Sequence, residues 1–201
     1  MKKRFLALAI MASTFSMHAM AADIEANMVK QVVEVTTPAF ADFLATNPLD
    51  IAQITSDFVN QATKSSSVES SFSNSHVASS TANGVSSFEI VAVGSSNVGW
   101  ESISATQLST NLDHSGSDLY VTAIMLGMGY SDGATLNGLA KQAFKNQALC
   151  GADLHDCLPG DTLSGFMFYF DYSGQESGTF NTSAHSIAIP FGYWSDSIYI
   201  N

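Results

Sequence analysis

Basic residues are scarce in this sequence, which has seven lysines and arginines against 18 aspartates and glutamates. Three of the seven, Lys2, Lys3 and Arg4, belong to an expected export signal, so the mature chain keeps four lysines against 18 acidic residues, a net charge of −14. Nucleic-acid binding requires a basic surface, and anionic lipids attract basic segments. The composition therefore argues against both partners. It indicates either solubility outside the cell or binding of divalent cations.

Long apolar runs are also missing. The apolar segment from Phe5 to Ser13 is too short to cross a bilayer, and no other stretch is long enough. It follows the positive N-terminus and precedes Ala19-Met20-Ala21, which fits the small-x-small cleavage rule. We therefore expect residues 1–21 to be a signal peptide. The mature protein is expected to be secreted or periplasmic, with no membrane anchor.

Only two cysteines are present, Cys150 and Cys157, and both follow the signal. In an oxidising compartment a close pair of this kind predicts a disulfide bond. The enclosed loop is short, so its entropic contribution lies at the low end of roughly 2–4 kcal/mol. The alternative is a Cys/His nucleophile, because His155 lies two residues from Cys157.

Catalytic and cofactor motifs are absent as well. The sequence contains no Gly-x-Ser-x-Gly, no phosphate-binding loop, no His-Glu-x-x-His and no dinucleotide fingerprint. No cofactor is expected, apart from the calcium considered below, and whether the protein is an enzyme stays open.

Three regions follow the signal. Residues 22–64 have helical periodicity, with one apolar stripe at 24–33 and capping residues before proline at Thr37-Pro38 and Asn47-Pro48. Residues 65–87 form a serine-rich, unpatterned linker that contains His76. The remaining region, 88–201, has short strand-like segments separated by turn signals.

The most strongly patterned strand is Gly165–Tyr172, which places three phenylalanines on one face. Leu119–Leu126 is apolar on both faces and is therefore expected at the centre of a sheet. Other strands are expected at Phe88–Val93, Glu101–Leu108, Thr179–Thr182, His185–Phe191 and Ser195–Ile200. The pattern predicts a mainly β fold: an antiparallel β-sandwich, or a partly open barrel, preceded by short amphipathic helices and the linker.

The segment Ala134–Leu149 is ambiguous. Asn137-Gly138 is typical of a two-residue hairpin turn. The apolar residues that follow fit a helix, so we expect a hairpin or extended piece at Thr135–Leu139 and a short helix from about Ala140 to Ala148.

The turn that begins with Asp113-His114 is the candidate catalytic site. A histidine beside a carboxylate can act as a tuned base or a metal ligand. The alternative is a polar turn in which Asp113 caps backbone amides. His185 heads an apolar strand face and is expected in the core or at its rim.

Three carboxylates, Asp153, Asp156 and Asp161, lie on or beside the loop between the cysteines. Calcium prefers oxygen ligands of this kind, although the spacing is not that of an EF-hand. The hypotheses are a calcium site and an acidic surface loop held by the disulfide.

Aromatic residues recur near the strand ends, at Trp100, Tyr130, Tyr193 and Trp194, with Glu101 beside the first. If they are exposed together, such residues can stack on sugars or peptides. They are the candidate binding residues. The alternative is ordinary packing in the core and at its rim.

Five short motifs carry a family resemblance: Gly99-Trp100-Glu101-Ser102-Ile103, Asp113-His114-x-Gly116, Leu126-Gly127-x-Gly129-Tyr130, Leu136-Asn137-Gly138 and Trp194-Ser195-Asp196-Ser197-Ile198. Together they resemble the YolA-like family of exported bacterial proteins, over about residues 88–201. The resemblance implies no activity, because the function of that domain family is not established. By this resemblance, the Cys150–Cys157 loop looks like an elaboration of the place where the relatives have an Asp-rich segment, which weakens any inference about calcium.

Two functional hypotheses remain. The first is a non-catalytic binding or interaction module for an extracellular ligand or protein. The second is a secreted hydrolase or toxin centred on Asp113 and His114, with residues 22–64 as a removable prosegment.

Overall fold

The computed structural model describes residues 37–66 and 83–201. The expected signal peptide at 1–21, the apolar stripe at 24–33 and most of the expected linker, with His76, lie outside these residues.

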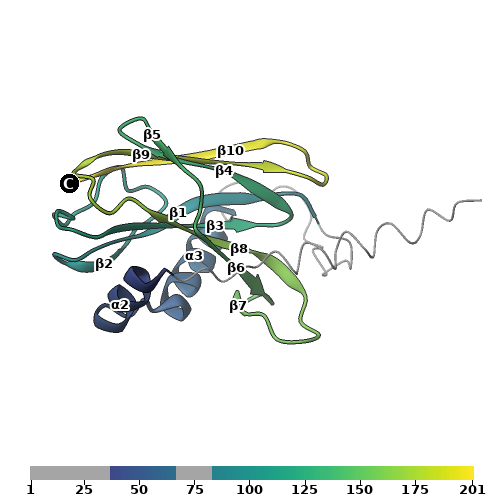
Figure 1. Cartoon of the computed structure of the whole chain (residues 1–201). Coiled ribbons are helices and arrows are strands. Elements are labelled where there is room, and N and C mark those ends of the chain that lie inside the picture. Colours follow the sequence, from purple (N-terminus) through teal and green to yellow (C-terminus); the bar gives the residue numbers. More distant parts are fainter. Residues whose placement is uncertain (1–36, 67–82) are drawn as a thin grey trace, which may run out of the picture. The chain divides into compact units, whose positions relative to one another are not determined.

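The described chain forms two antiparallel β-sheets and two helices (Figure 1). The strand order is β2-β1-β3-β8-β6-β7 in the six-stranded sheet and β10-β9-β4-β5 in the four-stranded sheet. The strands are β1 (Ser87–Ser95), β2 (Gly99–Ser102), β3 (Leu119–Leu126), β4 (Gly129–Leu136), β5 (Leu139–Lys141), β6 (Lys145–Cys150), β7 (His155–Asp156), β8 (Leu163–Asp171), β9 (Gly178–Ser186) and β10 (Tyr193–Ile200). The prediction of a mainly β, antiparallel fold is confirmed.

The sandwich core lies between the two sheets. Alternation along β8 directs Phe168, Phe170 and the following Tyr172 into it, where each is at most 4% exposed, while Phe166 packs against its margin. Facing them from the four-stranded sheet is Phe180, which makes edge contacts with Phe170 and Tyr172 at ring distances of 5.6 Å. The predicted apolar face of this strand is therefore a core face.

The other face of the six-stranded sheet is covered by α2 (Pro38–Thr46) and α3 (Ile51–Ser66). Helix α2 begins as predicted, because the Thr37 side chain accepts a hydrogen bond from the Phe40 amide and Pro38 occupies the first turn. Its apolar stripe, which includes Phe40 and Phe43, packs on Tyr120 of β3.

The expected N-cap at Asn47 is wrong. The Asn47 amide donates to the Phe43 carbonyl, so this residue ends α2. The Asp50 carboxylate instead accepts from the Gln53 amide and caps α3. The two helices are thus separated by a short connection that contains Pro48.

The expected helix at Ala140–Ala148 is also wrong. The hairpin at Asn137-Gly138 forms with positive φ at both residues, which leads β4 directly into β5. After β5, strand β6 pairs with β8 along the whole length of β6. Pairing with the central strands therefore overrides the local helical spacing.

Two expected strands differ in extent. β2 ends at Ser102 instead of continuing to Leu108, and β9 reaches Ser186 and includes His185. Residues 187–192 form the turn that leads back into β10. Pro190 lacks an amide donor, and the chain must reverse here to pair antiparallel, so the expected strand His185–Phe191 cannot form.

Strand β1 of the six-stranded sheet contacts β10 of the four-stranded sheet at a β-bulge. The register of β1 shifts between Ile90 and Ala92, which releases the Ile90 amide from the ladder. This amide donates to the Asp196 carboxylate of β10 at 2.7 Å. A charged acceptor therefore satisfies the donor that the bulge leaves unpaired.

We expect Phe40→Ala to lower the free energy of unfolding by about 3–5 kcal/mol, because a fully buried ring in contact with Tyr120, Phe144 and Tyr169 is removed. Urea denaturation of the protein measures this. Phe191→Ala, at a position 71% exposed, is the control and should change stability by no more than about 0.5 kcal/mol. Equal effects of the two substitutions would show that α2 does not stabilise the sheet.

Candidate functional site

Glu101 of β2 holds a network of five hydrogen bonds and is only 8% exposed. One carboxylate oxygen accepts from the Asn111 amide at 2.8 Å, the Asn111 side chain at 3.1 Å and the Gln107 side chain at 2.8 Å. The other accepts from the Leu112 amide at 2.9 Å and lies 3.1 Å from His114 Nε2. Burial alone would raise the pKa of Glu101, but these bonds together hold the pKa below its ordinary value.

The segment that Glu101 secures runs along β10. The Tyr199 amide donates to the Leu108 carbonyl, the Thr110 amide donates back to Tyr199, and the His114 amide donates to Asn201. These bonds cover part of an edge that would otherwise expose unpaired backbone groups. The buried carboxylate therefore organises a structural loop.

The structure does not bring the two candidate catalytic side chains together. The Asp113 carboxylate accepts from the Ser115 amide at 3.0 Å, as expected for a capped polar turn. The His114 ring is 2% exposed and bonds Glu101 instead, while its Nδ1 has no hydrogen-bond partner. No serine hydroxyl reaches this ring in the described residues.

Cys150 and Cys157 form the expected disulfide bond. Both cysteines are in this bond, so neither provides the free thiol that a Cys/His nucleophile requires.

Two of the three carboxylates on or beside this loop share one partner, and the third has another. Asp153 and Asp161 bond the two ring nitrogens of His155 at 2.7 and 3.0 Å, and Asp156 accepts from the side chain of Gln147. Within residues 37–66 and 83–201, no group of three or more His, Cys, Asp or Glu side chains is arranged to hold a metal ion.

The aromatic candidates divide between the two sheets. The Trp100 indole donates to the Asn47 carbonyl and its ring packs edge-on against Phe43, so Trp100 anchors α2. Trp194 packs against the sandwich core. Neither of these tryptophans lies on the same face as Tyr130 and Tyr193.

Tyr130 and Tyr193 do come together, on either side of His185. The three residues are cross-strand neighbours on β4, β9 and β10, and we call them the aromatic row. The Tyr130 ring stacks on the imidazole at 5.5 Å, and the Tyr193 ring contacts it edge-on at 5.0 Å. Tyr130 is 52% exposed and Tyr193 60% exposed, so the row faces solvent on the outer side of the four-stranded sheet.

Asp132 orients the centre of the row. The register of β4 shifts at a β-bulge between Ser131 and Gly133, and Gly133 has φ +97°. Asp132 lies in this bulge and is exposed beside β9. The Asp132 carboxylate oxygens lie 2.7 and 2.8 Å from His185 Nδ1, and one of them accepts from the Ser183 hydroxyl at 3.1 Å. The ionised carboxylate fixes the hydrogen on Nδ1 and leaves Nε2 available to a ligand.

Beyond the row, the outer face of this sheet carries small polar side chains. They are Thr179, Asn181, Ser183, Ser195 and Ser197. Two exposed phenol rings beside a band of hydroxyl and amide groups can pack against a ligand and hydrogen bond to it.

His185 lies on the solvent-facing side of β9, and its pattern in the sequence predicts only a core or rim residue. The sequence does contain one signal for this placement. Ser183 and His185 are two residues apart, so in a strand they lie on the same face, and Ser183 makes that face polar. The cross-strand register that joins it to Tyr130 and Tyr193 could not be obtained locally.

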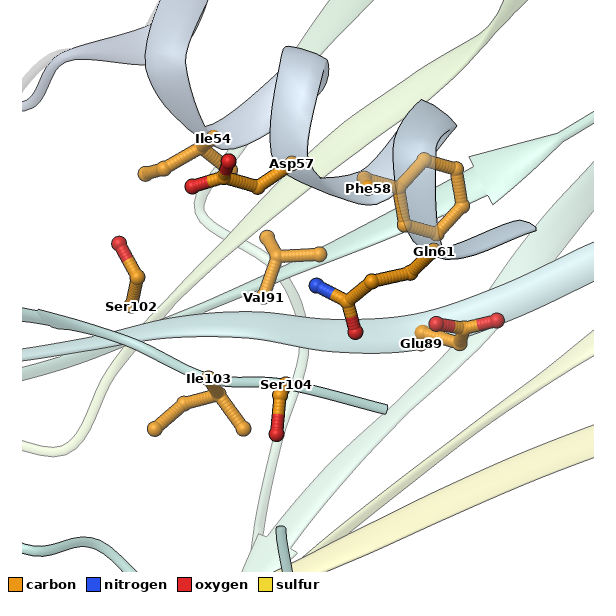
Figure 2. A pocket seen from close by; sticks show the side chains of 9 residues that line it. All are labelled: Ile54, Asp57, Phe58, Gln61, Glu89, Val91, Ser102, Ile103 and Ser104. Atoms are coloured by element: carbon orange, nitrogen blue, oxygen red, sulfur yellow. The ribbon is translucent and has the colours of Figure 1, made fainter. Parts of the chain in front are cut away.

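Two hollows lie along α3. The smaller, about 150 Å³, is formed with β1 and β2, and Figure 2 shows the Asp57 side chain on the helix and the Glu89 side chain on the strand. Asp57 accepts from Gln53, and Glu89 accepts from Ser87, while Gln61 accepts from the Ala105 amide. The larger, about 490 Å³, lies between α3 and the disulfide loop. Neither hollow presents a histidine paired with a nucleophile.

These observations define the chain as an antiparallel β-sandwich with one helix-covered sheet and one open sheet that carries an aromatic row. It belongs to the family described as a domain of unknown function (DUF4879), whose model matches residues 78–200. No curated protein matches the chain. Among the described residues, no helix is long and apolar enough to span a membrane.

We expect Glu101→Gln to lower the free energy of unfolding by about 2 kcal/mol at pH 7, because a buried ionised acceptor with five bonds is lost. Since folding lowers the pKa of Glu101, its contribution is present above the ordinary value of 4.5 and is lost as pH falls through the folded pKa. The difference from wild type should therefore shrink below about pH 4. Urea denaturation as a function of pH measures it, with Asp113→Asn as the control. A difference independent of pH would contradict the assignment.

The pKa of His155 is raised by its hydrogen bonds to Asp153 and Asp161. An NMR titration should therefore place the His155 midpoint above the ordinary value of 6.5, and Asp153→Asn should lower it. Asp156→Asn serves as the matched control, because Asp156 contacts Gln147 and not the ring. The same midpoint in wild type and Asp153→Asn would refute the contact.

Proposed function

We propose that this chain is an exported, non-catalytic binding module and that its ligand lies across the aromatic row. The observation that carries the proposal is the solvent exposure of Tyr130 and Tyr193 on either side of an oriented His185. The ligand is a neutral, hydroxyl-rich molecule, with oligosaccharides as its class.

The chemistry of the surface supports this class of ligand. Sugar rings present apolar C–H faces that pack on aromatic rings, and hydroxyl groups that bond polar side chains. The row supplies the rings, and the imidazole, the Asp132 carboxylate and the serines of β9 and β10 supply donors and acceptors. No lysine or arginine is present on β9 or β10, so anionic ligands are disfavoured.

Export is part of the proposal. It is supported by the signal-like pattern of residues 1–21 and by the disulfide, because disulfides persist in oxidising compartments. The same proposal includes two further statements. The chain is a member of the YolA-like exported proteins, and the mature chain is divided at the serine-rich segment 65–87.

The alternative of a hydrolase centred on Asp113 and His114 gains no specific support. Such a site requires the histidine to meet a nucleophile at a solvent-accessible surface. The His114 ring is instead buried against Glu101.

Binding to a panel of neutral cello-, xylo-, malto- and chito-oligosaccharides, measured by isothermal titration calorimetry, tests the proposal. We expect Tyr130→Ala and Tyr193→Ala each to weaken binding at least about tenfold, a loss of about 1.4 kcal/mol. Tyr199→Ala is the matched control, because Tyr199 is 46% exposed on the same face of β10 but at the other end.

The proposal is overturned if wild type binds none of these sugars. It is also overturned if the control weakens binding as much as the row variants do.

A further inference from the structure

A second exposed surface lies in the turn between β9 and β10. Ile187, Ile189 and Phe191 are 43%, 76% and 71% exposed, and we call these three residues the apolar tip. No charged residue occurs between His185 and Asp196. The turn lies at the end of the four-stranded sheet away from the C-terminus (Figure 1).

The tip is held in place by the backbone around it. The Ile189 carbonyl accepts from the Gly84 amide at 2.9 Å, and the Ile187 amide donates to the Met128 carbonyl at 3.1 Å. A side chain at Gly84 would lie 2.3 Å from the Ala188 carbonyl oxygen, so the two segments approach as closely as glycine allows. The fold thus fixes apolar side chains in an outward position.

The turn also satisfies several of its own polar groups. The Ser186 hydroxyl donates to the Ala188 carbonyl at 2.7 Å, and the Ser186 amide donates to the Gly192 carbonyl at 3.0 Å. With the Ile189 carbonyl, three carbonyl groups of the turn are bonded within the protein. Such bonding lowers the cost of moving backbone out of water, because unsatisfied polar groups are expensive in hydrocarbon.

The charge of the protein indicates which kind of lipid surface the apolar tip can contact. The mature chain has a net charge of −14, which opposes approach to anionic lipid. The turn itself carries no charged residue, and the Asp132 carboxylate beside it is paired with His185. The turn is followed by Tyr193 and Trp194, residue types that favour the polar interface of a bilayer. A neutral, zwitterionic surface is therefore the complementary one.

We propose that the apolar tip inserts into the surface of a zwitterionic lipid bilayer, as a peripheral attachment. The proposal goes beyond the sugar-binding function and does not depend on it, since it is carried by the turn and not by the aromatic row. Ile189 and Phe191 enter the acyl boundary, and Trp194 lies close behind them, because its ring packs over Gly192.

Binding of the exported chain to phosphatidylcholine vesicles, measured by co-sedimentation, tests the proposal. The double substitution Ile189→Ser with Phe191→Ser should lower the partition coefficient at least about tenfold. Leu108→Ser with Leu158→Ser is the matched control, because these leucines are 82% and 67% exposed elsewhere, and it should leave the partition coefficient unchanged.

Tryptophan fluorescence gives an independent readout. Brominated phosphatidylcholine should quench Trp194 in wild type and not in the tip variant, while Trp100 lies against α2 and does not respond. Tyr130→Ala should lose sugar binding but keep vesicle binding, so the two proposals fail separately. Circular dichroism and urea denaturation establish that each variant is folded.

Three results overturn the proposal: no binding of wild type to the vesicles, equal binding of wild type and tip variant, or loss of self-association in the tip variant without any lipid binding. The last result would assign the tip to a contact between two copies of the chain.

Discussion

Burial of the central strands β3 and β8 on both faces is the constraint on which the other features depend. Phe168 and Phe170 lie in the sandwich core, while Tyr120, Met167 and Tyr169 lie in a second cluster beneath the helices. A sheet of this kind cannot leave either face in water, because its apolar area must be covered on both sides. Both faces of the six-stranded sheet are therefore covered: one by the four-stranded sheet and the other by α2 and α3. The outer face of the four-stranded sheet, with Tyr130 and Tyr193, stays exposed to solvent.

Three histidines in the described chain each meet a carboxylate, and the surroundings decide what each pair can do. His114 with Glu101 is buried and ties a loop to the edge of a sheet. His155 lies between two aspartates on the disulfide loop. His185 with Asp132 is accessible and flanked by aromatic rings. The same chemical pairing is thus structural in one place and suited to binding in another, because His185 is flanked by exposed aromatic rings and has a carboxylate on one ring nitrogen only, whereas both ring nitrogens of His155 bond carboxylates.

The aromatic row and the apolar tip adjoin one another at one end of the four-stranded sheet. Both are placed by the β9–β10 hairpin, whose long register fixes His185 opposite Tyr193 and positions the turn beyond them. A rigid hairpin presents these side chains without a large ordering cost on binding. If both proposals hold, the module would bind a sugar while its tip rests on a neutral lipid surface, which would place the ligand close to a membrane.

Local chemistry alone determined much of this protein. The phenylalanine alternation of Gly165–Tyr172, the Thr37 cap, the Asn137-Gly138 hairpin and the nearby cysteine pair each depend on residues close in sequence, and each has its structural counterpart. The tertiary structure decided the rest. The segment 140–148 is divided between β5 and β6 because β4 and β8 provide partner strands, and His114 bonds Glu101 instead of its neighbour Asp113. The row joins Tyr130 to residues more than fifty positions away through the register of three strands. Periodicity indicates which side chains share a face of one strand, but only the pairing of strands decides which faces meet.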